Sequence, residues 1–187
     1  MVRSPALRDR IAAGILDTAA AVFAERGESA SMTDVAEAAG VGRATLYRYF
    51  PNRDALLRGL TDVAVEDLLR RVADAELDRV PVREGIARLA RGFVTAGSKY
   101  AVLAQTRKDP ATTAELDRLL GAPVRALLAR GIAEGTLRAD LPADLQFALF
   151  TGLLEHVLAL VAAKRIGIEQ ASAAITTVFL DGTTVDD

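Results

Sequence analysis

Apolar residues recur at three- and four-residue spacing along most of the chain, and β-branched residues seldom alternate with polar ones. The composition is rich in alanine, leucine, arginine and glutamate, which favour helices. The sequence therefore predicts an all-α protein of about nine helices. Two short helices are expected within residues 31–50, and glycine or proline separates longer ones at residues 8–26, 51–77, 82–97, 99–108, 112–135, 142–164 and 168–180.

Residues 31–50 predict two short helices joined by a tight turn. Ser31 is a suitable N-cap, and Asp34 three residues later completes an acidic form of the capping box. Gly40 can adopt the positive φ that ends the first helix. The second helix, Arg43 to Phe50, is followed at once by proline. Two short helices joined by a turn that contains glycine have the outline of a helix-turn-helix.

Two of the three tyrosines in the chain, Tyr47 and Tyr49, lie in the second of these helices, flanked by arginines. A helix in the major groove of DNA contacts base edges with its first turn and phosphates with its flanks. Tyr47 and Tyr49 would then present hydroxyl donors on side chains with few rotamers. The alternative is that both rings only half-bury in a small core, with the arginines as a solvated surface.

The run from "ILDTAAAVFAERG" through "SMTDVAEAAGVGRATLYRYFPNRDALL" resembles the N-terminal DNA-binding region of the TetR family of bacterial transcriptional regulators. The rest of the chain resembles the family only through its number of helices and the "GTLRADLPADLQFALF" lead into a long apolar helix. The resemblance implies a three-helix helix-turn-helix domain over residues 1–57. An all-helical dimerisation and effector-binding domain would follow over residues 58–187.

The resemblance also implies roles for individual residues around the second short helix. Arg43 would bond a guanine, and nearby methyl groups would meet a thymine methyl. The residues expected to contact bases are Thr33, Arg43, Ala44, Thr45 and Arg48. Those expected to contact phosphates are Tyr47, Tyr49 and Arg53. The chain departs from the family at Gly42, where a serine-like cap is common, at Tyr49, where histidine is common, and at Arg53, where lysine is common.

The segment Leu145 to Ala163 contains one formal charge and is nearly long enough to cross a bilayer. Glu155 and His156 lie near its midpoint, where an ionisable group costs about 2.5–3.5 kcal/mol to insert. No Trp or Tyr marks either end of the segment. The sequence therefore favours a buried helix of a soluble protein, and no membrane partner is expected.

This apolar helix has two different sides. One is bulky, and the other is a stripe of small or polar residues: Ala148, Thr151, Gly152, Glu155 and Ala159. A single chain of this size has too few other helices to cover both sides, so a homodimer is predicted. The sequence does not decide which of the two sides forms the interface. The resemblance implies dimerisation through the last two long helices. Two recognition helices about 34 Å apart would then read a palindromic operator.

A small-molecule pocket in the C-terminal domain is implied only by the resemblance. Few basic residues lie between Pro142 and Ala163, which favours an apolar or weakly polar ligand over a phosphorylated one. Ordinary core packing is the alternative for each aromatic residue of this region. The candidate pocket residues are Phe93, Tyr100, Phe147, Phe150 and His156.

Composition excludes several classes of protein. The chain has no cysteine and one histidine, and it has neither a G-x-S-x-G elbow nor a phosphate-binding glycine loop, so no enzyme, metal site or cofactor is expected. Charged residues interrupt the N-terminal apolar positions, which predicts a cytoplasmic protein. The net charge is -2, so a DNA partner must be argued from local arrangement.

The predicted function is a DNA-binding transcriptional regulator, a homodimeric repressor that reads a palindromic operator through the helix Arg43 to Phe50. A small, mainly apolar ligand in the C-terminal domain would release it. The alternative is a helical protein-interaction module with a vestigial helix-turn-helix and no specific operator. Such a module has no need of the arrangement formed by Arg43, Thr45, Tyr47 and Arg53.

Overall fold

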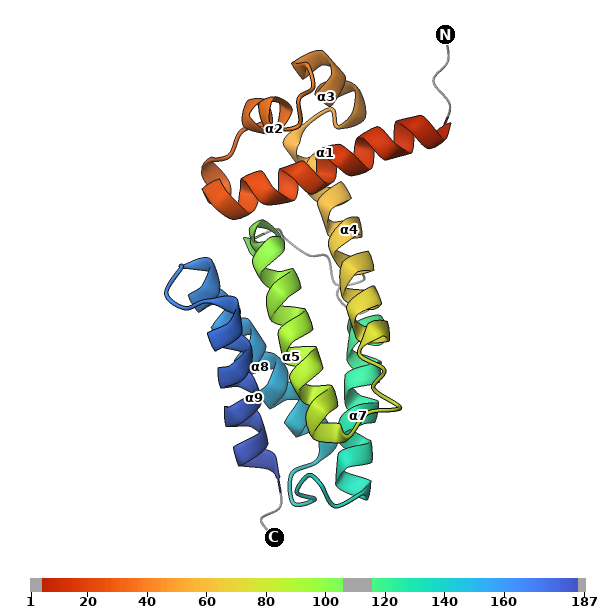
Figure 1. The fold of residues 1–187 in the computed structure, drawn as a ribbon, viewed down its shortest axis with the longest axis vertical. Helices are drawn as coiled ribbons and strands as arrows, with labels where there is room; N and C mark the ends of the chain where they lie inside the picture. The colour runs from red at the N-terminus through yellow and green to blue at the C-terminus, as the bar shows by residue number, and fades with distance from the viewer. Residues whose placement is uncertain (1–4, 106–115, 185–187) are drawn as a thin grey trace. The chain divides into compact units, whose positions relative to one another are not determined.

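The computed structural model describes residues 5–105 and 116–184 of the chain (Figure 1). No strand occurs in these two ranges, and Leu137 and Thr184 form an isolated antiparallel bridge. The all-α prediction is confirmed. The eight α-helices of the described residues are α1 (Pro5–Arg26), α2 (Met32–Ala38), α3 (Arg43–Tyr49), α4 (Arg53–Asp74), α5 (Val82–Lys99), α7 (Ala122–Ala133), α8 (Ala143–Ala162) and α9 (Ile168–Thr183).

Three shorter helical segments connect some of these helices. They are the 3-10 turns η1 (Gly27–Ser29) and η2 (Ala101–Gln105), and the π-helical segment η3 (Asp117–Gly121), which leads directly into α7. Of the helix expected over residues 99–108, Lys99 is the last residue of α5, Ala101–Gln105 form a 3-10 helix, and residues 106–108 lie outside the described ranges. Residues 112–115, the start of the next expected helix, also lie outside them.

The chain divides into two compact units. The first comprises the described residues of Met1–Val65 and Lys99–Arg107, and the second those of Glu66–Ser98 and Lys108–Asp187. Helix α4 therefore contributes to both. A compact unit need not be an independently folding domain, so the predicted domains 1–57 and 58–187 stay a prediction.

The first unit has its own small hydrophobic core. Helix α1 contributes one apolar face, which includes Ile15, Ala19 and Phe23, all almost fully buried. Leu46 of α3 and Leu56 of α4 are also fully buried. The apolar spacing that predicted these helices is therefore the spacing that builds this core.

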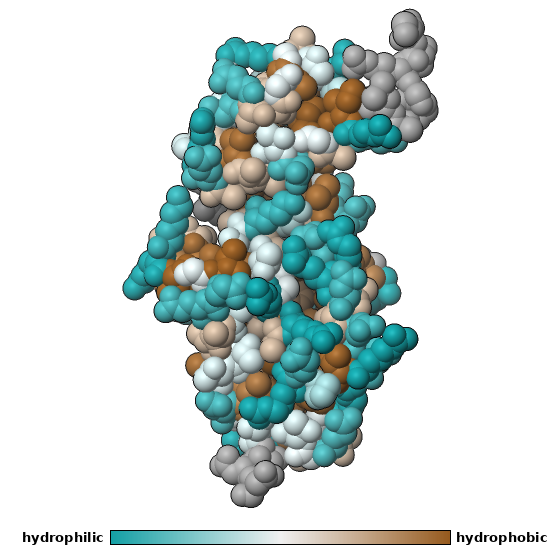
Figure 2. Space-filling view, viewed as in Figure 1, coloured by the Kyte–Doolittle hydropathy of each residue, from teal (hydrophilic) through white to brown (hydrophobic). Residues whose placement is uncertain are grey.

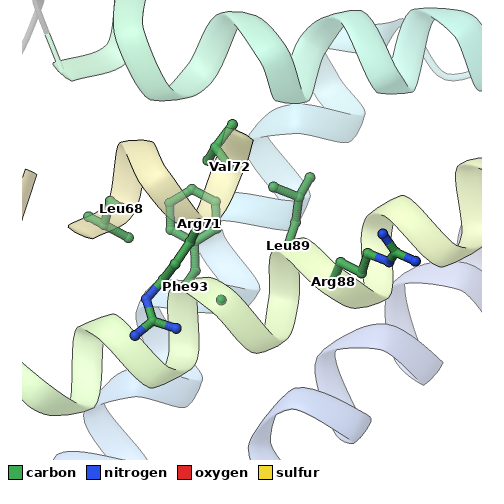
Figure 3. A pocket seen from close by; sticks show the side chains of 7 residues that line it. Leu68, Arg71, Val72, Arg88, Leu89 and Phe93 are labelled. Carbon is green, nitrogen blue, oxygen red and sulfur yellow. The ribbon is translucent and has the colours of Figure 1, made fainter. Parts of the chain in front are cut away.

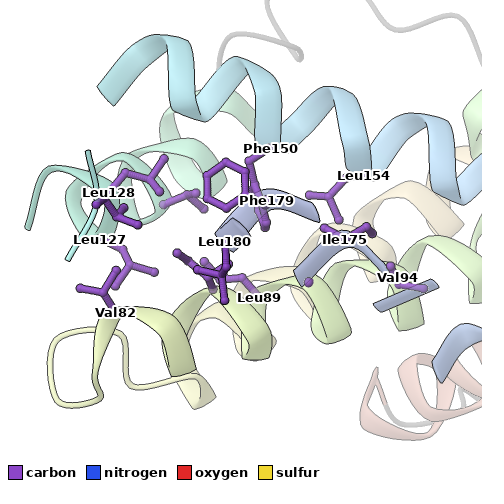
Figure 4. Packing of buried hydrophobic residues seen from close by; sticks show 14 of the residues in the cluster. Val82, Leu89, Val94, Leu127, Leu128, Phe150, Leu154, Ile175, Phe179 and Leu180 are labelled. Carbon is purple, nitrogen blue, oxygen red and sulfur yellow. The ribbon is translucent and has the colours of Figure 1, made fainter. Parts of the chain in front are cut away.

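The core of the second unit gathers side chains from α5, α7, α8 and α9 (Figure 4). The rings of Phe150 on α8 and Phe179 on α9 meet edge to face, with centroids 5.1 Å apart and an interplanar angle of 67°. Val82 and Leu89 of α5 approach from the other side of this pair, together with Leu127 of α7. Edge-to-face packing of this kind contributes beyond the apolar area that it buries.

Helix α4 ends three residues earlier than its apolar pattern predicts. Its last residue is Asp74, and Glu76 takes a φ of 48°. Left-handed backbone at this place is typical of the residue that follows a helix, although glycine is the usual occupant. The pattern continues to Leu77, because that side chain packs against the core from the turn that follows the helix.

Helix α8 is the one described helix with the length and hydropathy of a membrane span. Its buried residues in this chain are Gln146, Phe150, Leu154 and Val161, so most of the helix is not covered. The core helix of a soluble protein has the same length and composition. On the face of the molecule shown in Figure 2, hydrophobic surface is divided into separate patches by hydrophilic side chains.

Candidate nucleic-acid interface

Helix α2 begins at the predicted capping box. The Ser31 hydroxyl oxygen accepts a hydrogen bond of 3.2 Å from the Asp34 N–H, and the Asp34 carboxylate accepts one of 2.7 Å from the Ser31 N–H. Arg26, at the end of α1, lies 2.5 Å from the same carboxylate. Hydrogen bonds from the hydroxyl and the N–H of Ser31, together with the charge of Arg26, hold the pKa of Asp34 below its usual 3.8.

The turn between α2 and α3 depends on Gly40. Its φ is +64°, a value that residues other than glycine rarely adopt. No atom lies within 4 Å of the position that a Cβ would occupy. The Val41 N–H donates to the Ala36 carbonyl at 3.0 Å, and the Gly40 N–H to the Glu37 carbonyl at 3.1 Å. This pair of bonds satisfies the last carbonyls of α2 and turns the chain into α3.

Helix α3 has one buried side and one exposed side. Leu46 is fully buried, and Phe50, the C-cap, is nearly so. The N-cap is Gly42, which provides no side-chain bond, as the departure from the family pattern predicts. Because α3 is only seven residues long, its stability must come from this packing rather than from its own hydrogen bonds.

The exposed side of α3 carries most of the residues predicted to contact DNA. Arg43, Ala44, Tyr47 and Arg48 are all exposed, and 46% of the Tyr47 surface is accessible. These residues follow the i, i+1, i+4, i+5 spacing that places side chains on one side of a helix. The structure therefore brings four of the eight predicted contact residues together on one accessible surface.

Three further predicted contact residues are half-buried beside this surface. Thr45 lies on α3, Thr33 lies in the first turn of α2, and Tyr49 ends α3. The guanidinium carbon of Arg48 is 5.5 Å from the centroid of the Tyr49 ring, within the range of a cation–π contact. The base and phosphate assignments of all seven residues stay predictions.

Arg53, the eighth predicted contact residue, has partners within the chain. Its Nη1 donates a hydrogen bond to the carbonyl of Ala30, and its guanidinium carbon lies 4.7 Å from the centroid of the Phe23 ring. The sequence analysis missed these contacts, since Arg53 follows Ala30 by 23 residues and Phe23 by 30. No periodicity within one helix indicates a pairing at such separations.

The five predicted pocket residues lie in different environments. Phe150 belongs to the core, Tyr100 is buried in the first unit, and His156 is exposed on α8. The guanidinium carbon of Arg125 lies over the Phe147 ring, 3.8 Å from the ring centroid. Phe93 lines a cavity of about 10 Å³ between α4 and α5, where it faces Arg71 and Val72 (Figure 3). That volume is enough for one water molecule.

A larger hollow, of about 590 Å³, lies between α4 and α7 in the second unit. None of the five predicted pocket residues lines it, and their assignment to a ligand site stays a prediction. Glu76, Asp78 and Arg130 supply its charged groups. Its apolar lining is Leu69, Val72, Ala73, Leu77, Leu119, Pro123, Ala126 and Leu127.

The stripe predicted on α8 as a dimer interface is largely accessible. Ala148, Gly152, Glu155 and Ala159 are exposed, and Thr151 is half-buried. The exposed large apolar residues Leu145 and Leu149 lie on α8, and Val178 on α9 is 58% exposed. Leu149 is a bulky residue next to this stripe, so the exposed side of α8 carries large apolar residues as well as small ones.

Residues 31–50 thus form a helix-turn-helix, with a capped first helix, a glycine turn and a second helix that exposes arginine and tyrosine, as in a DNA-binding protein. The family model "Bacterial regulatory proteins, tetR family" matches residues 15–60. The N-terminal region of the chain is therefore similar to this family, and the fold is that of TetR-like regulators.

Individual relatives agree with this assignment. The chain is 38% identical to the HTH-type transcriptional repressor LfrR of Mycolicibacterium smegmatis, over 40% of this chain and 48% of that protein. The aligned part therefore spans about half of that repressor. The repressor KstR2 of Rhodococcus jostii is 24% identical over 71% of each chain. These relatives are regulators rather than enzymes.

The likeness in fold extends over nearly the whole chain. The crystal structure of LfrR from Mycobacterium smegmatis in complex with proflavine superposes with a TM-score of 0.75 at 25% identity. It covers 95% of this chain and 99% of that one. The described helices after α4 therefore have the arrangement found in a TetR-like regulator, although the family model matches only the N-terminal region.

Proposed function

We propose that this chain is a cytoplasmic transcriptional repressor that binds double-stranded DNA as a homodimer and reads a palindromic operator through α3. The observation that carries the proposal is the accessible surface of Arg43, Ala44, Tyr47 and Arg48 on a helix whose opposite side is anchored by Leu46. Accessible guanidinium groups next to a hydroxyl suit phosphates and base edges. The TetR-family helix-turn-helix supports the same function.

Within this surface, Arg43, Ala44, Thr45, Arg48 and, on α2, Thr33 are assigned to base edges. Arg43 is the first residue of α3 and is exposed, so a groove that receives the start of this helix can reach it. Tyr47 and Tyr49 are assigned to phosphates. Arg53 is left out of this set, since its side chain is engaged within the protein.

The direct test is selection of bound duplexes from a random-sequence DNA library by the purified protein, repeated at low and high salt. The expected result is enrichment of a palindrome that is retained at moderate salt, because base contacts add to phosphate contacts there. Recovery of unselected duplexes alone, lost as salt rises, would favour the interaction module over the repressor.

Two variants then separate base reading from phosphate binding. Arg43→Ala is expected to cost about 1–3 kcal/mol on the selected duplex and much less on a scrambled one. Tyr47→Phe is expected to weaken both duplexes alike, because it removes one hydroxyl that carries no sequence information. Arg58→Ala, an exposed position on α4, is the matched control. Equal losses for Arg43→Ala and Arg58→Ala would contradict the assignment.

The homodimer is proposed on the exposed face of α8 together with α9. Leu145, Leu149 and Val178 leave apolar area in contact with water, and the small residues between them allow another helix to approach closely. Gly152 offers a clean test, since no atom of the chain lies within 4 Å of its missing Cβ. A Cβ there meets no atom of the same chain, so a loss of dimer at this position is expected to arise between chains.

Gly152→Arg is therefore expected to convert the dimer into a monomer in sedimentation velocity, while circular dichroism stays unchanged. Ala129→Arg, which places the same charge on an exposed position of α7, is the matched control and should stay dimeric. A Gly152→Arg protein that remains dimeric would move the interface elsewhere.

The releasing ligand is proposed to be small and mainly apolar, bound in the hollow between α4 and α7. Its volume of about 590 Å³ is that of a small-molecule site, and most of its lining is aliphatic. The LfrR structure, solved with proflavine, supports a bound molecule in a chain of this fold. Nile red, an uncharged apolar dye, is a suitable probe.

Ala126→Trp, which fills the hollow, is expected to lower Nile red affinity about tenfold or more, whereas Ala129→Trp on the same helix should not. Saturating dye should also weaken binding of the selected duplex. Equal dye affinity in both variants would exclude the hollow as the site. Unchanged DNA affinity in the dye complex would exclude release by this route.

A further inference from the structure

Arg53 stands at the first position of α4, and its side chain reaches two other elements of the first unit. Nη1 donates to the carbonyl of Ala30, and the guanidinium lies over the ring of Phe23 on α1. Both partners are almost fully buried, with Ala30 at 1% and Phe23 at 2% exposed. The guanidinium therefore lies against the interior of the unit.

The Ala30 carbonyl lies at the junction between η1 and α2. Ala30 closes η1, its backbone is extended, and its own N–H is bonded to the Gly27 carbonyl at 3.3 Å. The next residue, Ser31, is the N-cap of α2. A bond to this carbonyl fixes the peptide plane that leads into the capping box, and so fixes the direction in which α2 begins.

Arg53 also lies close to the end of α3. Phe50 is the C-cap of α3, and Arg53 opens the next helix after a short link. The Arg53 side chain thus links α1 to the start of α2, and its backbone lies three residues after the C-cap of α3. Because α3 packs on α2 across the glycine turn, this connection constrains the whole helix-turn-helix.

A positive charge at the N-terminus of a helix opposes the helix dipole, so Arg53 is placed unfavourably for α4 itself. A charge-assisted hydrogen bond and a cation–π contact offset that cost. A lysine could not make both contacts as well, since its single ammonium has no planar fork to span the carbonyl and the ring.

We propose that Arg53 is a positioning residue: it holds the helix-turn-helix in register on α1 for base reading, rather than serving as a phosphate contact. The inference rests on the proposed DNA-binding function. It predicts that Arg53 acts through the placement of α2 and α3, which sets it apart from the exposed residues of α3.

The test compares Arg53→Lys and Arg53→Ala with Arg58→Ala, which removes an exposed charge one turn later on α4. Amide hydrogen exchange is followed at Asp34 and Val35, whose N–H groups close the first turn of α2. Both Arg53 variants should exchange about tenfold faster or more at these two amides. Arg58→Ala should exchange at the wild-type rate.

Binding is then measured on the selected duplex and on a scrambled duplex of equal length over a salt series. Loss of register should lower the ratio of the two affinities about tenfold in both Arg53 variants. The salt dependence on the scrambled duplex should keep its wild-type slope, since no phosphate contact is lost. A merely structural role would lower stability and leave the ratio unchanged.

The proposal would be overturned if Arg53→Lys kept the wild-type amide exchange rates and the wild-type ratio of the two affinities, while Arg53→Ala reduced the slope of the salt dependence by about 0.9. That combination would identify a phosphate contact. Failure of the proposed function gives a different signature, because the wild-type protein would then select no duplex while the exchange comparison could still be made.

Discussion

Helices α3 and α8 each bury one side and expose the other, but the exposed side chains have opposite chemistry. On α3 they include Arg43, Tyr47 and Arg48, and on α8 they include Leu145 and Leu149. Guanidinium and hydroxyl groups suit a polyanion, whereas apolar side chains in water favour contact with another protein surface. Exposure alone therefore does not define a partner, and each surface must be tested by a different perturbation.

The two helices also differ in what holds them. Helix α3 has seven residues and depends on Leu46 and on the turn before it, whereas α8 has twenty residues and packs on α7 and α9. A short helix is marginal without tertiary contacts. Single substitutions should therefore disturb the DNA-binding surface more than the α8 surface.

The largest expected effect is that of Leu46→Ala. Leu46 is fully buried, so truncation should lower the free energy of unfolding by about 2–5 kcal/mol. Leu149→Ala, at 47% exposure, should change it by less than about 0.5 kcal/mol when the chain is monomeric. Urea titration at low protein concentration measures both. Equal losses would mean that α8 is as dependent on this face as α3 is on its core.

The next effect is loss of the α2 cap. Ser31→Ala removes the hydroxyl that accepts from Asp34 N–H, and should cost about 1 kcal/mol in urea unfolding. Ser31→Asn keeps an acceptor at the N-cap and should retain most of the stability. The N-cap of α8 is Pro142, which makes no side-chain bond, so α8 has no equivalent site. An Ala variant as stable as the Asn variant would contradict the role of the cap.

Local signals made the helix-turn-helix predictable from the sequence. Ser31 and Asp34 stand at capping-box spacing, and Gly40 stands where the backbone turns left-handed, so both features follow from a few adjacent residues. The apolar spacing of α1 likewise predicted its buried face, including Ile15 and Phe23. Such features depend on backbone geometry within a few residues, which a sequence displays directly.

Contacts between distant residues were not predictable in the same way. The partners of Arg53 lie on α1 and before α2, and nothing in the spacing of arginine and phenylalanine indicates that pairing. The pattern of α8 likewise did not reveal that Leu149 is exposed while Phe150, the next residue, is in the core. Helix orientation depends on neighbours far away in sequence, and these are known only once the fold is known.

A smaller effect compares the ends of α2 and α8. Both helices are followed by a left-handed residue, Gly40 at φ +64° and Lys164 at φ +56°. Gly40→Ala should lower stability by about 1 kcal/mol, since space is open and only backbone strain is added. Lys164→Gly should raise it by up to about 1 kcal/mol. Thermal unfolding measures both, and the same sign for both variants would contradict strain as the cause.

The last comparison concerns pH. Ser31 and Arg26 lower the pKa of Asp34 from 3.8, so this carboxylate stabilises the folded state above about pH 4 and loses that contribution as pH falls through its folded pKa. Asp34→Asn should therefore be less stable than wild type near neutral pH, and the difference should close in acid. Urea unfolding across this range measures it, and a difference that is constant with pH would contradict the linkage.

Asp67, in the second unit, also has a lowered pKa and should also lose its stabilising contribution in acid, but the cause differs from that at Asp34. Burial raises the pKa of this carboxyl, but hydrogen bonds from Arg70 and Arg71 outweigh burial and leave the pKa below 3.8. If one arginine is removed, fewer hydrogen bonds offset the increase in pKa that burial causes. Arg71→Ala should therefore raise the pKa of Asp67 and move its loss of stability to higher pH, whereas Arg26→Ala should shift Asp34 much less, since Ser31 provides the largest part of that shift. Carboxyl titration by NMR in the two variants measures this contrast, and equal shifts would contradict the conclusion that Ser31 rather than Arg26 is the main cause of the low pKa of Asp34.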